Sequence, residues 1–380
     1  MRVTRVETIS LKRGITVHAG PIQWLWVRVH TDAGIVGLGE TYPHPGAESA
    51  VVLDRLAPVL LGQDALAIEK LWAEMFLAVS YSGWAGAECR AISAVDMALW
   101  DLAGKAAGLP VYRLLGGPCR EQIRVYNTCY DHIDFHADPV RLARSLLESG
   151  ISAMKIWPFD RVAGETGGHS ISAAQMRQGL EPLRLIREEL GDSMEVAMEF
   201  HGLWDLACAI EIARACEPYS PLWLEEMLPQ DNLAAYERLA QVTRAPLTIS
   251  ERLMTHWQYR ELAENGAARV FMPDLSWCGG LTAARKIAAL AETYYLPVAP
   301  HNCGGPVLHV ASAHFAAAIP NLKILETVRR HYGEEYAGLT NGQLSPVQGW
   351  LPLPPGPGLG VELRPEVLAR DDLTVGSREG

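Results

Sequence analysis

The pattern of hydrophobic and polar positions divides the chain into two parts. As far as about Glu40, large apolar residues alternate with polar ones, as in "WLWVRVHTDAGIVGLGE". This alternation predicts antiparallel strands, and the Asp-Ala-Gly sequence predicts a hairpin turn between two of them. From about residue 48 to 115 the spacing becomes helical, and Gly108-Leu109-Pro110 ends the clearest stripe. That stripe consists of Ile92, Val95, Leu99, Leu102 and Ala106. Strands followed by helices, without alternation, predict a separate α+β domain.

After about residue 118, short apolar runs alternate with helical segments. Six successive runs end in a residue that can bind a metal ion or transfer a proton, at intervals of 23 to 27 residues. These residues are Glu199, Glu225, Glu251, Asp274, His301 and Glu326. Several helical segments of this part begin at a capping candidate, namely the Ser172–Gln175 capping box, Asp205 and Asp231. The repeat predicts consecutive βα units and a parallel sheet.

An open doubly wound sheet and a closed barrel both fit this repeat. In an open sheet the site lies at one switch point, whereas a barrel carries functional groups at the C-terminal ends of many strands. Ionisable groups at six strand ends therefore predict a barrel. The polar, glycine-rich segment 160–172 is predicted to be a loop inserted over its mouth. The strands are expected to end near Tyr130, Lys155, Glu199, Glu225, Glu251, Asp274, His301 and Glu326.

Composition narrows the class of protein. The chain has 380 residues, 49% of them hydrophobic, which is enough for two domains with large cores. A net charge of −11 argues against nucleic-acid binding. The seven cysteines form no CxxC motif and are odd in number, as expected in a reducing cytoplasm. No apolar stretch has the length of a membrane span, and the N-terminus alternates like a strand rather than a signal peptide, so we predict a cytoplasmic protein.

The three glutamates on consecutive strand ends carry the clearest chemistry. Their side chains are expected to converge, and three carboxylates in one place raise one another's pKa unless a divalent ion neutralises them. Ligands that are all oxygen select a hard cation. Glu199, Glu225 and Glu251 therefore predict a site for Mg²⁺, with Mn²⁺ as the alternative.

The other strand ends predict proton-transfer groups beside this metal. Asp274 lies one strand before His301, where its carboxylate can set the tautomer of the imidazole. Lys155 ends an earlier strand, and His201 follows Glu199 by two residues, so both are expected to point into the mouth. This set suits removal of a proton next to a carboxylate, with the metal holding the resulting enediolate. Metal-assisted hydrolysis and phosphoryl transfer also use such metals, but the chain has no GxxxxGK[ST] motif.

Several motifs resemble one family over nearly the whole chain. They are "SAVDMALWDLAGKAAGLPVYRLLGG", the three strand-end glutamates, "MPDLSWCGGLT", "APHNCGGP", "ILE" and "PPGPGLGVE". Together they are similar to the enolase superfamily, mandelate racemase subgroup. The resemblance implies an α/β fold, a modified TIM barrel of (β/α)7β type at 119–348, with an α+β capping domain at 1–118. The tail, 349–380, would return to the capping domain.

The resemblance also implies roles for individual residues. Glu199, Glu225 and Glu251 would hold Mg²⁺, and Asp274 with His301 would form the dyad that acts as base or acid. Glu326 would hydrogen-bond the substrate carboxylate, and Lys155 matches the first lysine of a Lys-x-Lys motif. Loops at 14–21 and 42–48 would close the mouth, and a homo-oligomer is expected.

Three departures from the family pattern narrow the reaction. Trp157 replaces the second lysine, so the base that racemases use on one substrate face is missing. His201 resembles the histidine with which the sugar-acid dehydratases of the family protonate the departing hydroxyl. Met227 replaces a proline after the second metal ligand, which leaves that ligand intact.

The sequence therefore predicts a Mg²⁺-dependent lyase that dehydrates an aldonic or related sugar acid to a 2-keto-3-deoxy acid, by syn or anti elimination. His301 would abstract the α-proton, and His201 or His301 would donate to the leaving hydroxyl. Racemisation or epimerisation of a 2-hydroxy acid and a catalytically silent sugar-acid binder are the alternatives. Further substrate contacts are expected from Trp157, Tyr42, His18 and His44, with Trp84 and His169 as additional polar or stacking candidates.

Overall fold

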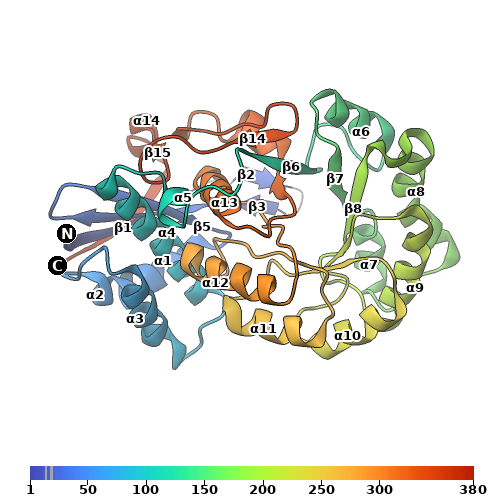
Figure 1. The fold of residues 1–380 in the computed structure, drawn as a ribbon, viewed down its shortest axis with the longest axis horizontal. Helices are drawn as coiled ribbons and strands as arrows, with labels where there is room; N and C mark the ends of the chain where they lie inside the picture. Colours follow the sequence, from blue (N-terminus) through green and yellow to red (C-terminus); the bar gives the residue numbers. More distant parts are fainter. Residues whose placement is uncertain (13–14, 18–19) are drawn as a thin grey trace.

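The computed structural model describes residues 1–12, 15–17 and 20–380, and side chains at 1–12 and 23–380. The chain begins in a four-stranded antiparallel sheet of order β16-β1-β4-β5. Its strands are β1 (Val3–Leu11), β4 (Leu25–Thr31), β5 (Val36–Thr41) and β16 (Leu373–Glu379). Because β16 pairs with β1 along its whole length, the chain ends beside its beginning (Figure 1), as the sequence predicts for the tail. Two short strands, β2 (Ile15–Val17) and β3 (Gly20–Ile22), form a separate pair.

The predicted hairpin and helix are both present in this part. Gly34, with a φ of 74°, closes the turn between β4 and β5 by donating its N–H to the carbonyl of Thr31. The helix α4 (Ala87–Ala107) ends at Gly108, whose left-handed φ of 67° terminates it. The other helices here are α1 (Pro45–Val51), the π-helical turn η1 (Val52–Leu56), α2 (Ala57–Leu60), α3 (Ile68–Ser80) and α5 (Val111–Leu114). The α+β architecture expected for the first 118 residues is confirmed; the domain boundaries stay predictions.

A closed parallel barrel follows. Seven strands pair in the order β11-β10-β9-β8-β7-β6-β12. Residues 297–301 close the ring, because Val298 bridges both Phe271 and Leu322, and Asp274 bridges His301. The strands are β6 (Gln122–Thr128), β7 (Ala153–Ile156), β8 (Glu195–Glu199), β9 (Leu224–Glu225), β10 (Leu247–Ile249), β11 (Val270–Phe271) and β12 (Leu325–Thr327). The predicted barrel is confirmed, including the approximate positions of its strand ends.

Helices alternate with these strands on the outside of the barrel (Figure 1). They are α6 (Pro139–Glu148), α7 (Asp160–Thr166), α8 (Ala173–Leu190), α9 (Leu206–Cys216), α10 (Leu233–Val242), α11 (Thr255–Asn265), α12 (Gly280–Thr293) and α13 (Pro306–Ala318), with 3₁₀ turns η2 (Gly191–Ser193) and η3 (Glu217–Tyr219). The capping box at Ser172 and the cap at Asp205 are confirmed. The predicted cap at Asp231 is wrong, because α10 begins one residue later and Asn232 accepts the N–H of Ala235. The segment predicted as a loop at 160–172 begins with the short helix α7.

The C-terminal tail pairs with the barrel before it returns to the N-terminal sheet. After the π-helical turn η4 (His331–Glu335) and β13 (Thr340–Asn341), β14 (Trp350–Pro352) first pairs antiparallel with the barrel strand β6. Then β15 (Glu362–Leu363) pairs with β13, α14 (Pro365–Leu368) follows, and β16 joins the N-terminal sheet. The Pro/Gly-rich segment thus ties the barrel to that sheet. No helix among the described residues is long and apolar enough to cross a membrane.

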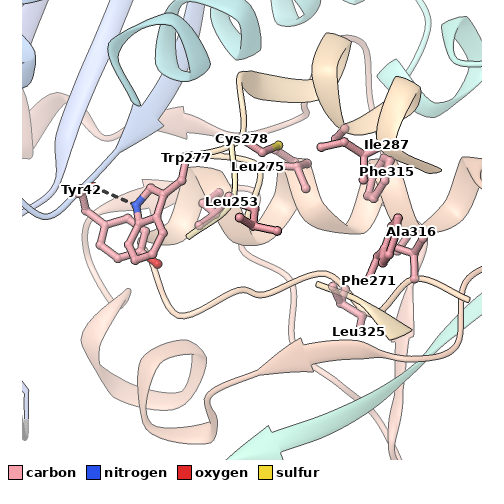
Figure 2. Packing of buried hydrophobic residues seen from close by; sticks show 14 of the residues in the cluster. Tyr42, Leu253, Phe271, Leu275, Trp277, Cys278, Ile287, Phe315, Ala316 and Leu325 are labelled. Atoms are coloured by element: carbon pink, nitrogen blue, oxygen red, sulfur yellow. Dashed lines mark hydrogen bonds between the residues drawn. The ribbon is translucent and has the colours of Figure 1, made fainter. Parts of the chain in front are cut away.

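The junction between the N-terminal part and the barrel is packed. The indole N–H of Trp277, after β11, donates to the carbonyl of Tyr42, after β5, at 2.9 Å, and the two rings lie 5.0 Å apart (Figure 2). The hydroxyl of Thr41 donates to the carbonyl of Ser276 at 2.9 Å. Glu40 accepts the first N–H groups of α13, from Val307 and Leu308. These contacts fix the end of β5 against the rim of the barrel.

The contact between β5 and α4 gives a first prediction. A Cβ at Gly39 would lie 1.9 Å from the carbonyl oxygen of Ala94, so Gly39→Ala forces two backbones apart and should destabilise the protein by about 1–3 kcal/mol. Gly46→Ala is the control, because a Cβ there meets no atom within 4 Å. Thermal unfolding followed by circular dichroism should show a lower midpoint for Gly39→Ala only. Equal midpoints for the two variants would contradict this packing.

Candidate active site

Three glutamates meet at the C-terminal rim of the barrel. Glu199 ends β8, Glu225 ends β9, and Glu251 follows β10 by two residues. All three are buried, and one carboxylate oxygen of each lies within 4.8 Å of the others. The convergence that the sequence predicts is therefore present, because adjacent parallel strands bring residues of equal register to the same rim.

Lys155 on β7 lies inside this cluster. Its Nζ is 2.5 Å from Glu225 Oε1, 2.9 Å from Glu326 Oε1 and 3.6 Å from Glu199 Oε2. Burial alone would lower the pKa of Lys155, but the carboxylates, Glu225 first, raise that pKa well above its usual value. Burial raises the pKa of Glu199 to about 7 and that of Glu225 well above its usual range. The single positive charge of Lys155 therefore does not compensate the negative charges of the cluster.

The residues fit a divalent cation. Glu199 Oε2 is buried and has no hydrogen-bond partner among the described residues, and an ion at the triad would satisfy it. All the donors of the triad are carboxylate oxygens, the ligands that Mg²⁺ and Mn²⁺ prefer. The buried triad Glu199, Glu225 and Glu251 is thus consistent with a divalent-metal site.

Across the rim, Asp274 holds His301. His301 Nδ1 lies 2.7 Å from Asp274 Oδ2, and the same carboxylate accepts the hydroxyl of Tyr42 at 2.8 Å. Its other oxygen accepts the N–H and the hydroxyl of Ser276 at 2.7 and 2.6 Å. Because both oxygens of Asp274 accept hydrogen bonds, His301 donates from Nδ1, and Nε2 is the ring nitrogen available for chemistry.

The Nε2 side of His301 faces two carboxylates. It lies 3.2 Å from Glu251 Oε2 and 3.8 Å from Glu326 Oε2. Burial by itself lowers the pKa of His301, but Glu251 and Glu326 raise that pKa well above its usual value. Glu326 is itself held by the hydroxyl of Thr128 and, at 2.8 Å, by the N–H of Asn302. Against burial, Lys155 and His301 lower the pKa of Glu326 to about 2.

His201 lies beside the triad on a turn with a positive φ of 50°. The backbone N–H of His201 donates to Glu199 Oε1 at 2.6 Å. The ring nitrogen Nδ1 of His201 lies 2.6 Å from Oδ2 of Asp160, the first residue of α7. Burial lowers the pKa of His201, but the hydrogen bond and charge of Asp160, together with the charge of Glu251, outweigh burial and raise this pKa. The edge of the His201 ring meets the buried Trp157 ring, with centroids 6.1 Å apart. A second imidazole with a carboxylate partner thus lies at the same rim as His301.

The glutamate after the second triad member has a partner of its own. Glu226 accepts the hydroxyl of Ser250, and its Oε2 lies 3.0 Å from Arg252 Nε. Both partners flank Glu251, so Glu226 holds the turn that carries this glutamate from both sides. Arg252 also donates to the carbonyl of His201 at 2.9 Å. The adjacent pair Glu225-Glu226 therefore contacts two cations from other parts of the chain, Lys155 on β7 and Arg252 after β10.

The predicted substrate contacts lie in different places. Tyr42 is buried behind Asp274, where its hydroxyl is already donated, and Trp157 packs between His201 and Phe135 at the rim. His44 is exposed at the start of α1, outside the hydrogen bonds and ion pairs of the cluster among the described residues. Of the other candidates, His169 pairs with Asp205 and Trp84 packs on Phe76 and Trp257. His18 lies outside the described residues.

Sequence reasoning missed the residues that hold these groups. Asp160 belongs to the segment predicted to be a loop. Nothing in the sequence around it indicates a contact with His201, which lies 41 residues further along the chain. Arg252 directly follows Glu251 in "ISERL", a visible basic neighbour whose partner could have been sought. Thr128 and Asn302, which bind Glu326, stand next to strand ends but have no charge to attract notice.

A closed parallel barrel with a buried glutamate triad, a lysine and an Asp–His pair at its C-terminal rim defines a class of metal-dependent barrel enzymes. The model for enolase C-terminal domain-like proteins matches residues 138–367, and the model for the mandelate racemase / muconate lactonizing enzyme N-terminal domain matches residues 10–116. The chain therefore belongs to the enolase superfamily, mandelate racemase subgroup. It is an enzyme of a superfamily that acts on small carboxylate substrates.

Individual relatives agree with this assignment. A crystal structure of an enolase of the mandelate racemase subgroup from Agrobacterium tumefaciens superposes with a TM-score of 0.90 at 42% identity, covering 100% of this chain and 99% of the other. The chain is 33% identical to a D-xylonate dehydratase of Haloferax volcanii over 362 residues, 92% of this chain and 85% of that protein. It is 30% identical to a D-galactonate dehydratase of Pectobacterium atrosepticum, covering 97% and 94%.

The triad predicts how metal binding responds to a single substitution. Glu225→Gln keeps the size of the side chain but removes one of the three charges, so Mg²⁺ affinity should fall at least about 100-fold, since a lost charged ligand costs several kcal/mol. The Mg²⁺ affinity is measured by isothermal titration calorimetry on protein from which a chelator has removed bound metal. The exposed Glu237 provides the control, and Glu237→Gln should bind as the wild type does. Equal affinities for both variants would place the metal elsewhere.

Proposed function

We propose that the protein is a Mg²⁺-dependent dehydratase of a sugar acid, an aldonate or a related compound. It would remove the proton next to the carboxylate and eliminate the β-hydroxyl, giving a 2-keto-3-deoxy acid. The observation that supports this best is the presence of two carboxylate-held imidazoles, His301 with Asp274 and His201 with Asp160, at one rim. Dehydration needs a base for the α-proton and an acid for the hydroxyl. The dehydratase names of the relatives point the same way.

In this proposal Glu199, Glu225 and Glu251 hold the cation, which would stabilise the negative charge that develops on the substrate carboxylate. Lys155, already inside the cluster, binds the carboxylate from the other side and offsets its charge. A substrate carboxylate bound beside Glu326 would raise the pKa of this glutamate, and the protonated form of Glu326 would then donate the hydrogen bond that orients the substrate. His301 takes the α-proton at Nε2, because Asp274 keeps the other ring nitrogen protonated.

The departing hydroxyl needs a proton. His201 is the acid that the geometry favours, because Asp160 holds Nδ1 and thereby leaves Nε2 to face the substrate side. His301 is the alternative, since the proton it has taken can be returned to the leaving group in a syn elimination. Trp157, beside His201, would pack against the carbon chain of the substrate. Tyr42 would act indirectly, through Asp274.

Racemisation is less well supported. A racemase needs a proton-transfer group on each face of the α-carbon, and the second position of the Lys-x-Lys motif is Trp157, whose indole cannot accept a proton at neutral pH. Exchange of the α-proton without elimination is the measurement that would favour racemisation or epimerisation.

The substrate class is tested directly. Protein with Mg²⁺ is incubated with a library of C4 to C6 sugar acids that includes D-xylonate and D-galactonate, and 2-keto acid is assayed with semicarbazide. At least one member should give product, and Glu225→Gln should give none. Silence across the whole library would count against dehydration.

The acid role of His201 has its own test. His201→Asn should lower kcat for dehydration about 10² to 10⁴-fold, because general acid catalysis of the leaving group is lost. Exchange of the α-proton with solvent deuterium, measured by NMR, should persist, because His301 is intact. His169→Asn is the control, a nearby exposed histidine on the inserted segment. If His201→Asn retains full turnover, His301 is the acid.

A further inference from the structure

A second group of metal-binding atoms lies beside the proposed Mg²⁺ triad. One donor atom each from His301, Cys303 and Glu326 lies within 4.8 Å of the others. Cys303 follows the closing segment of the barrel by two residues and is partly buried, while His301 and Glu326 are buried. The donors are a nitrogen, a sulfur and an oxygen, so this group differs in chemistry from the all-oxygen triad.

The described contacts already orient two of these ligands. Asp274 occupies Nδ1 of His301, so Nε2 is the ring nitrogen left to bind a cation, and it lies 3.8 Å from Glu326 Oε2 and 3.2 Å from Glu251 Oε2. A carboxylate behind a histidine is the usual support for a histidine that ligates zinc. Glu326 Oε2 is in turn held by the N–H of Asn302. A cation arriving here would find its histidine and carboxylate in position.

We propose that His301, Cys303 and Glu326 form a site for a thiophilic divalent cation, with Zn²⁺ as the type case, separate from the triad. Zinc accepts mixed thiolate, imidazole and carboxylate ligands in a four-coordinate arrangement, with water completing the set. Sulfur ligation selects Zn²⁺ over Mg²⁺, which is a hard cation with little affinity for thiolate. On binding, the bonds from Sγ and Nε2 to Zn²⁺ form, and the thiol proton and the proton on Nε2 pass to solvent.

Such a site would inhibit the enzyme. The zinc ion would occupy Nε2 of His301, the atom that takes the α-proton in the proposed reaction, and Glu326, which orients the substrate carboxylate. The two metal sites therefore have opposite effects, because Mg²⁺ at the triad supports turnover and Zn²⁺ beside it blocks the base. This inhibitory role rests on the proposed function, whereas the metal site itself does not.

The site is tested without turnover. Full-length protein saturated with Mg²⁺ is titrated with Co²⁺, a zinc substitute whose bond to a thiolate gives a near-ultraviolet charge-transfer band. The wild type should develop this band and lose it when Zn²⁺ is added, whereas further Mg²⁺ should leave it unchanged. Absence of the band in the wild type would overturn the proposal, and this measurement needs no variant.

Two variants assign the band to its ligand. Cys303→Ser should abolish it, whereas Cys119→Ser, which removes an exposed thiol bonded to the carbonyl of Ala318, should leave it intact. Circular dichroism confirms that each variant is folded. Persistence of the band in folded Cys303→Ser would overturn the proposal.

The inhibitory effect is measured separately, on the sugar acid that the enzyme dehydrates. With saturating Mg²⁺, Cys303→Ser should need at least about 10-fold more Zn²⁺ than the wild type for half inhibition, each compared with its own uninhibited rate, since a lost ligand costs more than about 1.4 kcal/mol. An unchanged value would mean that Zn²⁺ acts at the triad, which overturns the inhibitory role. A cobalt band without any turnover would instead count against the proposed function and leave the site standing.

Discussion

Burial of several carboxylates at one end of a barrel is the constraint on which the rest of this structure depends. Glu199, Glu225, Glu251, Asp274 and Glu326 are all buried there, and such charges are costly unless they are paired. Lys155 is buried among them and contacts three. Burial raises the pKa of Glu199 and of Glu225 in spite of this lysine, and a divalent cation at the triad would offset the remaining negative charge.

A second layer of residues holds the charged groups in place, and much of it comes from distant parts of the chain. Tyr42, at the end of the N-terminal sheet, supports Asp274, and the same segment is fastened to the barrel through Trp277 (Figure 2). Glu226 and Arg252 hold the turn of Glu251. The N-terminal part therefore does more than cover the barrel, because it supplies a hydrogen bond to the Asp274–His301 pair.

The rim brings together two groups of side chains whose donor atoms differ in kind. Oxygen donors at the ends of β8 and β9 and in the turn after β10 form one group, and the segment after β11 adds a nitrogen and a sulfur. Both groups of donor atoms depend on the same arrangement, in which successive strands end at the C-terminal rim of the barrel. Selectivity between the two groups would follow from donor type, an all-oxygen set against a set of nitrogen, sulfur and oxygen.

The sequence by itself determined the barrel, the triad, Lys155 and the Asp274–His301 pair. These follow from a regular repeat, because equal spacing of strand ends places their last residues on one rim whatever the side chains between them do. Only the tertiary structure decided which residues contact the site: Asp160 beside His201, Arg252 beside Glu226, and Tyr42 behind Asp274. It also decided that Asn232, rather than Asp231, caps α10. These contacts depend on the exact positions that loops and helix ends take when they pack against the barrel. No spacing along the chain encodes that, since the partners come from elements whose separation in sequence has no fixed period.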